Sequence, residues 1–502
     1  MEDLYGRTKI TIPVSKEKFD INPLKYIEHY LLDCSTKNEK NKQDCEKLNN
    51  YYLGKQDILN KTRFNFDEKN NNILVANHHF RQVEFKKGFT VGNPIDYSLR
   101  EADEKDIGKE LAQLKTYLTD EDKAEKDIDK YEDLYKCGMA LQFLIPKRRD
   151  FEYGKEAPFE LMNVELGTAF VVYSNDIASD QLFNVVISSE IDEEFVSRKV
   201  YYVYYINNSD NGYCYLAKYK SGSIAGIPER VAISNEKQPY KFLPLIEYAL
   251  NKNRIGVVEL VLLIGNALNL LQSNQLDDII DFVNSYIIFE NVDPKFVLNN
   301  IKEFREKKTI AIKSNNPATP AKVSSLKQTL SHAEVNQLFD ILKREMYDIT
   351  ATPQSSGEVS SGGDTGEARI LGNGWESAQN QAKVDTLYIA QFERKLLKYM
   401  ILICKDDTKN NINSLSASDI SIKYDINMSN NILTKTQALQ NLDSVGMPHE
   451  ESLKMTGLTN DTNGVATKWQ ANLEAKEQKA LELAQASAQN QNNNNENEPK
   501  EE

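Results

Sequence analysis

The chain has 502 residues, of which 40% are hydrophobic and 27% are charged, and its formal net charge is −14. That length is too great for a single hydrophobic core and suggests about three domains. The acidic balance excludes nucleic-acid binding by the overall field of the chain, which leaves only a local basic patch for such a contact.

The cysteines and the apolar segments indicate the cellular compartment of the protein. The five cysteines are scattered without a Cys-x-x-Cys pair, which favours a reduced, cytosolic environment over a disulfide framework or a zinc site. The most apolar run, residues 255–271, is interrupted by Glu259, Asn266 and Asn269 and is a poor transmembrane candidate. Residues 1–5 begin no signal peptide. We therefore expect a cytosolic, multidomain protein without a membrane span.

The first half of the chain predicts helices and then strands. Apolar spacing indicates helices at residues 16–33, 41–53, 77–87 and 106–136, and the many charges of the last one predict a solvent-exposed face with little core. Runs rich in β-branched and aromatic residues predict strands at 140–145, 169–173, 182–187, 200–205 and 213–217. The short connections favour an antiparallel meander.

The longest helical signal covers residues 254–289, a predicted rod of roughly 50 Å. Its second half is two-faced, with Asp277, Asp278 and Asp281 on the polar side. The first half is apolar nearly all round and needs neighbours on several sides. A single chain offers few such neighbours, so packing against copies of itself is the natural solution.

Residues 291–330 form a basic insert with a predicted strand at 309–312. Three acidic residues stand against eight basic ones, which are Lys295, Lys302, Arg305, Lys307, Lys308, Lys313, Lys322 and Lys327. The local charge of +5 is opposite in sign to that of the whole chain.

A helix at 331–349, a Gly/Ser-rich loop and a second long helix reaching residue 404 follow. Ser331 and Glu334 form a predicted capping box. The apolar face of the first helix comprises Val335, Leu338, Leu342, Met346 and Ile349, and that of the second includes Leu371, Trp375, Ala378 and Ala382.

The C-terminal part predicts one strand at 421–424 and helices at 435–444, 448–455 and 466–489. Residues 490–502 are of Asn/Glu low complexity, a composition that predicts disorder.

Several segments in combination carry a family resemblance. They are Tyr-Tyr-Leu-Gly at 51–54 with Asp-Ile-Leu at 57–59, the Gly-x-Pro-Ile core at 92–95 within 88–97, residues 244–248, the 263–283 helix with Asn269, Ser273 and Phe282, and the Gly-rich loop that enters a long helix. Over roughly residues 51–404 the chain resembles the portal proteins of tailed bacteriophages, the head-to-tail connectors, of the type found in long-tailed phages and prophages of Gram-positive bacteria.

The resemblance implies an α+β portal fold with long stem helices, an antiparallel β-rich wing and a helical C-terminal crown. Its parts would be a wing at 1–253 and 367–434, stem helices at 254–290 and 331–350, a clip at 291–330, a tunnel loop at 351–366, a crown at 435–489 and a disordered tail at 490–502. In that family the subunits form a homo-oligomeric ring, usually of twelve, around a channel for double-stranded DNA at one capsid vertex.

The resemblance also implies roles for particular residues. The DNA constriction would lie at Ser355, Ser356, Gly357, Glu358, Ser360, Ser361, Gly362, Gly363 and Asp364. The channel wall would include Asp277, Asp278 and Asp281. Docking at the clip would use Lys295, Lys302, Arg305, Lys307, Lys308 and Lys313. The predicted tunnel loop at 351–366 departs from the family pattern because it contains no Lys or Arg. The resemblance therefore does not identify which of its residues contact DNA.

Its implied partners are other copies of the chain, double-stranded DNA, terminase, a head-completion or adaptor protein, and the scaffold and major capsid proteins. The protein would nucleate head assembly and serve DNA packaging and ejection, in the virion and in the host cytoplasm during assembly. No cofactor, metal, membrane or enzymatic activity is implied.

Other interpretations remain open at this point. Residues 361–366 before a helix suggest a phosphate cradle, but they lack a P-loop ending and follow a helix, so a connecting loop is favoured. The three aspartates could serve a soluble, metal-dependent DNA-processing enzyme, although a solvated helix face is favoured. The five histidines lack partners at ligand spacing. A third alternative is an adaptor whose long helix binds other proteins without forming a conduit.

Overall fold

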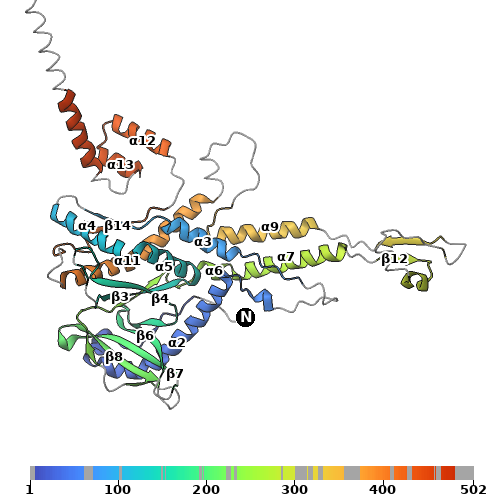
Figure 1. Cartoon of the computed structure of the whole chain (residues 1–502), viewed down its shortest axis with the longest axis horizontal. Coiled ribbons are helices and arrows are strands. Elements are labelled where there is room, and N and C mark those ends of the chain that lie inside the picture. The colour runs from blue at the N-terminus through green and yellow to red at the C-terminus, as the bar shows by residue number, and fades with distance from the viewer. Residues whose placement is uncertain are drawn as a thin grey trace, which may run out of the picture. The chain divides into compact units, whose positions relative to one another are not determined.

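In the computed structural model, whose elements are labelled in Figure 1, the chain divides into two compact units. The first unit contains residues 1–45, 84–256 and 379–502, and the second contains 46–83 and 257–378. The described residues are 6–480 except 61–71, 101–104, 149–150, 153, 192–194, 196, 222–227, 231–234, 284–286, 300–313, 315–319, 326–331, 355–373, 407–411, 427–431, 457 and 459–464. Among these residues, no helix combines the length and apolar character needed to span a bilayer.

A seven-stranded sheet dominates the first unit, and its central four strands confirm the predicted antiparallel meander. Its strands are β1 (Thr11–Ile12), β5 (Ala169–Ser174), β6 (Gln181–Ile191), β7 (Ser197–Asn207), β8 (Tyr213–Ser221), β9 (Pro228–Arg230) and β10 (Glu236–Lys237). Strand β1 runs parallel to β5, whereas β5 to β8 pair antiparallel, with Val185 opposite Val203. Phe183, Val203 and Ile27 meet in its core.

Two smaller sheets complete the first unit. The predicted strand at 140–145 exists as β3 (Met139–Pro146), but it lies outside the meander and pairs with β4 (Phe159–Val164) and β11 (Leu245–Ala249). Sequence analysis missed β4 and β11. The predicted strand at 421–424 is confirmed as β14 (Ile420–Lys423), which pairs with β2 (Asp96–Leu99).

The N-terminal helices differ from prediction in their boundaries. After α1 (Lys16–Ile21), the helix α2 (Pro23–Tyr52) is continuous through the predicted gap, because no Gly or Pro follows Pro23 within it. A short turn η1 (Asp57–Asn60) precedes α3 (His78–Val91), which continues past Gly88. All five cysteines are described and buried, and they form no disulfide.

The predicted 106–136 helix is two helices. The expectation of little core is wrong for the second, whereas its outer face is exposed as expected. Helix α4 (Lys105–Asp120) and helix α5 (Lys123–Cys137) are separated by Asp122, whose φ of 48° lies in the left-handed region. Lys123, Asp127 and Lys130 of α5 are buried. Charged side chains can be buried where each has a charged partner.

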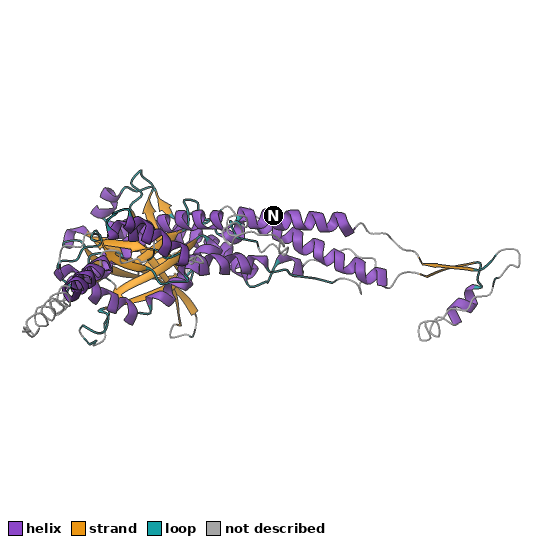
Figure 2. Cartoon of the chain, turned by 90° about the horizontal axis from the view of Figure 1, so that it is seen from above, coloured by secondary structure: helices purple, strands orange, loops and turns teal. Residues whose placement is uncertain are grey.

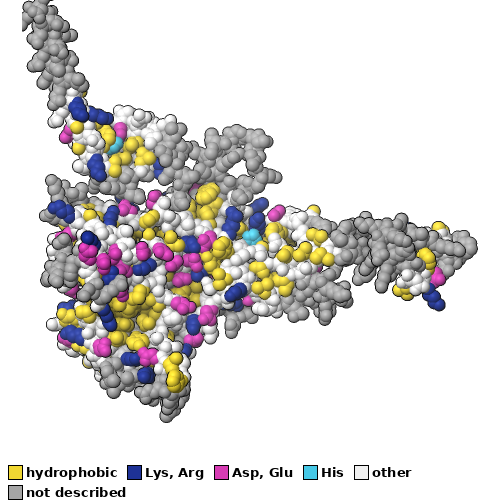
Figure 3. All heavy atoms as spheres, in the orientation of Figure 1, with side chains coloured by type: hydrophobic (Ala, Val, Ile, Leu, Met, Phe, Trp, Pro, Cys, Tyr) yellow, Lys and Arg dark blue, Asp and Glu magenta, His cyan; other side chains and the backbone are white. Residues whose placement is uncertain are grey.

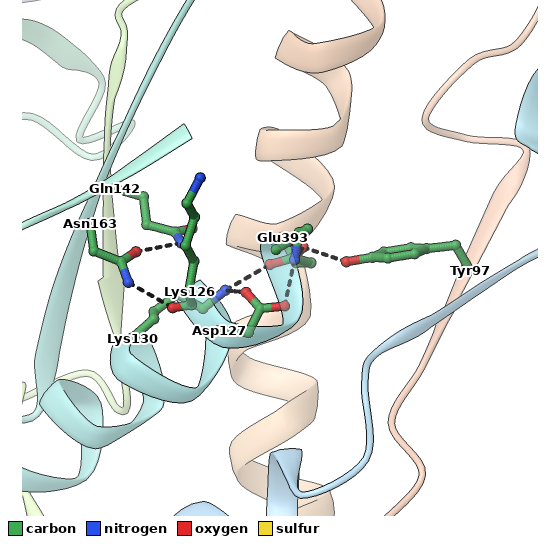
Figure 4. A network of polar contacts seen from close by, with 8 residues as sticks. Tyr97, Lys126, Asp127, Lys130, Gln142, Asn163 and Glu393 are labelled. Carbon is green, nitrogen blue, oxygen red and sulfur yellow. Dashed lines mark hydrogen bonds and ion pairs between the residues drawn. The ribbon is translucent and has the colours of Figure 1, made fainter. Parts of the chain in front are cut away.

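That partner comes from α11 (Trp375–Asp406), the long helix predicted after the Gly/Ser loop. Glu393 accepts from Lys123 at 2.6 Å, from Lys130 at 3.1 Å and from the Tyr97 hydroxyl at 2.7 Å. Asp127 lies 2.7 Å from Lys123 and 2.6 Å from Lys130. Two cations and two anions therefore balance in the interior (Figure 4). Burial raises the pKa of Glu393, but the two lysines and the Tyr97 hydroxyl outweigh burial and hold it well below its ordinary range.

Helix α5 is also hydrogen-bonded to the three-stranded sheet of β3, β4 and β11, called the small sheet below. Asn163 of β4 donates to the Lys126 carbonyl at 2.8 Å and accepts from Gln142 of β3 at 2.9 Å (Figure 4). The network thus fixes α5 between the small sheet and α11.

Two C-terminal helices are confirmed as α12 (Ile432–Ser444) and α13 (His449–Thr456). Residues 465–480 are helical, as predicted for part of 466–489, whereas the rest of that range and the low-complexity segment lie outside the described residues.

The second unit contains α6 (Val257–Leu260), α7 (Leu262–Val283), β12 (Ile287–Glu290), β13 (Lys322–Ser325) and α9 (His332–Ile349). The predicted 254–289 rod is wrong in its extent. Arg254 has a φ of 55°, a turn at Val261 separates α6 from α7, and residues from Ile287 onward form a strand that pairs antiparallel with β13. Helix α7 alone is roughly 33 Å long. The predicted strand at 309–312 and the cap at Ser331 lie outside the described residues.

Replacing Glu393 with glutamine should leave two buried ammonium groups facing a single carboxylate. We expect the free energy of unfolding to fall by about 3–5 kcal/mol, measured by urea denaturation. The matched control is Glu376→Gln at the exposed start of the same helix, which should change stability by less than about 0.5 kcal/mol.

The acid dependence gives a second readout of the same variant. Because the pKa of Glu393 is lowered on folding, its contribution is complete above about pH 4.3 and declines as pH falls toward the lowered pKa. The natural chain should therefore lose more stability than Glu393→Gln as the pH is lowered through that value. Equal losses in the two proteins would contradict this account of the network.

Candidate functional site

The candidate site is the antiparallel pair of helices α7 and α9, which lie side by side in both views (Figures 1 and 2). Their shared core consists of Val261, Leu268, Met346 and Tyr347, with Ile264, Phe339 and Leu342 packed at its edges. Gln275 on α7 donates to Asn336 on α9 at 2.9 Å. We call α7 and α9 together the stem hairpin.

An extended segment, residues 72–77, lies along α7 and uses its polar face. The main-chain N–H of Asn72 donates to Asp277 at 3.0 Å, that of Leu74 donates to the Ser273 hydroxyl at 3.0 Å, and that of Ala76 donates to Asn269 at 2.9 Å. We call residues 72–77 the strap and the three receiving side chains the polar ladder. Asn269 and Ser273 are fully buried, and Asp277 is 4% exposed.

The repeat lengths of helix and strap explain why the ladder works. Side chains four apart on a helix are separated by about 6 Å along its axis. Alternate residues of an extended chain are separated by roughly 6.6 Å, and their N–H groups point the same way. Asn269, Ser273 and Asp277 therefore meet Ala76, Leu74 and Asn72 in step. The ladder supplies acceptors to a backbone segment that pairs with no described strand.

The strap also connects to the helix that ends at Tyr52. Asn77 donates to the Tyr52 carbonyl at 2.8 Å, and Gln56 donates to the Asn77 side chain at 3.3 Å. The Asn269 amide, while accepting from the strap, donates to Gln56. Tyr51 and Asn266 share a hydrogen bond of 3.1 Å. Residues 46–60 and α7 are thus joined through side-chain amides.

Beyond the strap, the start of α3 contacts α9. The His78 ring lies 3.3 Å from the Tyr347 hydroxyl, and Gln82 donates to the Met346 carbonyl at 3.2 Å and to Thr350 at 3.3 Å. One stretch of chain, residues 72–82, therefore touches both helices of the stem hairpin and sets their spacing.

The His79 ring lies against Gly265 of α7. It is fully buried, it packs edge-on against Tyr51, and neither ring nitrogen makes a hydrogen bond to a described residue. Burial, with a smaller effect of His78, lowers the pKa of His79 to about 4. A Cβ placed on Gly265 would collide with this ring. A glycine is therefore required at position 265, because the uncharged imidazole of His79 leaves no room for a side chain there.

Much of the apolar surface of the stem hairpin is left uncovered in the single chain, as the yellow side chains over α7 and α9 show (Figure 3). Six large apolar side chains are between 40% and 62% exposed, namely Leu263, Leu270 and Ile279 on α7 and Leu338, Ile341 and Ile349 on α9. The α9 residues share one stripe, because their spacings of three and eight are helical repeats. An exposed apolar stripe of this kind is typical of an interaction site.

Comparison with known protein families shows to which family the chain belongs. The family model described as phage portal protein, SPP1 Gp6-like, matches residues 31–484. The chain belongs to the phage portal protein family. The match includes the whole stem hairpin, the strap and the polar ladder, and the family is structural rather than enzymatic. A comparison with curated proteins returned no match.

In this portal-family chain, the predicted channel-wall residues fall into different environments. Asp277 is buried against Asn72, which also donates to it through its side-chain amide at 2.8 Å, so its carboxylate does not line an open surface. Asp278 is half-buried. Asp281 lies in α7, but its side chain is outside the described residues. Over the described ranges, no group of three His, Cys, Asp or Glu side chains could hold a metal ion.

The other predicted sites are largely outside the described residues. All of the predicted tunnel-loop residues, Ser355 to Asp364, lie there, as do Lys302, Arg305, Lys307, Lys308 and Lys313 of the clip. Lys295 is described, within a short helical stretch that follows β12.

Sequence reasoning singled out Asn269, Ser273 and Asp277 but missed the strap that they bind. Asn72 stands in a segment without a distinctive motif. One available signal was the four-residue spacing of Asn269, Ser273 and Asp277 on an otherwise apolar helix. A polar stripe of that kind indicates a buried polar partner as readily as a wet face.

Asn269→Ala should release the strap, because the Ala76 N–H and the Gln56 side chain lose their partner. We expect a loss of about 1–3 kcal/mol in protection of the strap amides, measured by hydrogen exchange of Leu74 and Ala76. Asn274→Ala, an exposed asparagine on the same helix, is the matched control and should leave exchange unchanged. Equal exchange in both variants would refute the ladder.

Gly265→Ala should destabilise the fold, although alanine is the better helix former. Crowding of the His79 ring should cost about 1–3 kcal/mol, measured by thermal or urea unfolding. The control, Gly108→Ala in α4, has no heavy atom within 4 Å of its new Cβ and should gain up to about 1 kcal/mol. Adding His79→Ala should make the Gly265→Ala substitution less costly. A stabilised Gly265→Ala single variant would show that the contact is not as described.

Proposed function

We propose that this chain acts as a portal subunit, with copies arranged as a closed ring, of twelve as is usual in the family, around a channel for double-stranded DNA. Membership of the portal family supports the role, and the uncovered stem hairpin supports assembly with other copies. The exposed stripe on α9 is the single observation that carries this proposal, because a neighbouring stem hairpin offers apolar side chains of its own to cover it.

The charge of the chain suits a conduit. Each subunit carries −14, so DNA phosphates are repelled from most of the ring and the duplex slides without being held. Asp278 and Asp281 are the wall residues that remain after Asp277 is assigned to the ladder. The constriction is proposed at Ser355–Asp364, where the absence of Lys and Arg also avoids tight phosphate binding.

The basic clip, in contrast, suits docking. Lys295, with the other clip lysines and Arg305, forms a positive segment on an acidic protein, which is complementary to acidic surfaces of a packaging terminase and later of a head-completion or adaptor protein. Scaffold and major capsid proteins are the proposed partners during head assembly, and the capsid vertex is the proposed location.

Replacing both Leu270 and Leu338 with aspartate should dissociate the ring, because each buried leucine contributes about 1.5–3 kcal/mol to an interface. Static light scattering should report a ring for the natural chain and much smaller species for the double variant, with an unchanged circular dichroism spectrum. Ile177→Asp alters a fully exposed isoleucine of the first unit and should leave the ring intact. A double variant of undiminished mass would remove the stem hairpin from the interface.

A further inference from the structure

A second surface feature lies in the first unit, in a cavity of about 610 Å³. Its walls come from α1, the beginning of β6, the turn at residues 208–212, residues 241–243 and the C-terminal half of α11. A volume of this size accommodates a ligand of several side chains. Neither the stem hairpin nor the buried charge network of Glu393 contributes to it.

The cavity is positive in an acidic chain. Four lysines line it, Lys16, Lys241, Lys395 and Lys398, against the two carboxylates of Asp20 and Asp180. Its local charge of +2 contrasts with −14 for the whole protein. The lysines come from three separate parts of the chain, so the fold brings them together and no run of basic sequence does so.

Lys395 is the most enclosed of these lysines. Its ammonium group donates to the Gln181 side chain and lies 5.7 Å from the centre of the Tyr399 ring, and no described carboxylate is within ion-pair distance. Burial, opposed by the charge of Glu247 and reinforced by the charges of Lys16 and Lys398, lowers the pKa of Lys395 to about 8. An anion in the cavity would relieve this repulsion.

The walls of the cavity are also partly apolar, and this property favours a peptide over inorganic phosphate as the ligand. Leu182, Phe242 and Leu243 contribute buried side chains, and Leu402 is 38% exposed at its edge. Inorganic phosphate gains nothing from such groups, whereas glutamate and aspartate side chains interspersed with leucine or phenylalanine satisfy both kinds of wall.

We propose that this lysine-lined cavity is a docking site for an acidic, apolar-containing segment of a partner protein. The carboxylates of the segment pair with Lys395, Lys398 and Lys241, and its apolar side chains rest on Leu402 at the edge of the cavity. The site is independent of the stem hairpin and remains a binding site in a single subunit.

Fluorescence anisotropy with the full-length, assembled protein tests this proposal. The probe is a labelled hexapeptide of four glutamates, one leucine and one phenylalanine. Lys398→Glu combined with Lys241→Glu should weaken its binding about tenfold or more. Lys383→Glu, which makes the same charge change at an exposed position of α11 outside the cavity, should leave binding unchanged.

Further probes distinguish other occupants. A hexapeptide with glutamine in place of glutamate should not bind, and one with serine in place of leucine and phenylalanine should bind more weakly. Displacement by millimolar inorganic phosphate would overturn the proposal in favour of a simple anion site. Stronger peptide binding after deletion of residues 490–502 would overturn it in favour of the chain's own acidic end. An equal loss of peptide affinity in the Lys383→Glu control would also overturn the proposal, because the effect would then come from the net charge of the protein and not from the cavity.

Discussion

Two packed helices can bury only the faces that they turn toward each other, and this limit governs the stem hairpin. Helix α7 has its polar stripe covered by the strap and one apolar face covered by α9, yet Leu263 and Leu270 remain exposed. Among the described side chains of α9, only Met346 and Tyr347, near its C-terminal end, are well buried. Further apolar burial has to come from outside the hairpin, and in a family that forms portals another copy of the chain is the natural source.

Polar groups in this protein are buried where they meet defined partners. Asn269 and Ser273 accept main-chain hydrogen bonds from the strap, which fixes the register of an otherwise irregular segment against α7. In the first unit, Lys130 and Glu393 are fully buried as part of a balanced group of charges. An unpaired member of either group would be costly, so each arrangement specifies one packing of its elements.

Sequence reasoning succeeded where local periodicity decides the outcome. The meander strands, β14, α12 and α13 follow from alternation, aromatic content and turn residues, and the family was evident from combined segments. It failed where long-range contacts decide. The charges of α5 indicated little core, because the partner of its buried lysines, Glu393, lies about 265 residues away along the chain. Asp277 looked like a surface residue for the same reason, since Asn72 is distant in sequence. Breaks such as the turn at Val261 carry no Gly or Pro signal, and β11 was hidden by its continuity with a helical pattern.

The central claim is that the stem hairpin is completed by identical neighbours around an axis. Negative-stain electron microscopy of the purified, full-length natural chain tests it most directly. We predict closed rings of uniform diameter with a stain-filled central hole in the end-on view. A field of single, separate particles at high protein concentration, with no rings, would contradict the account.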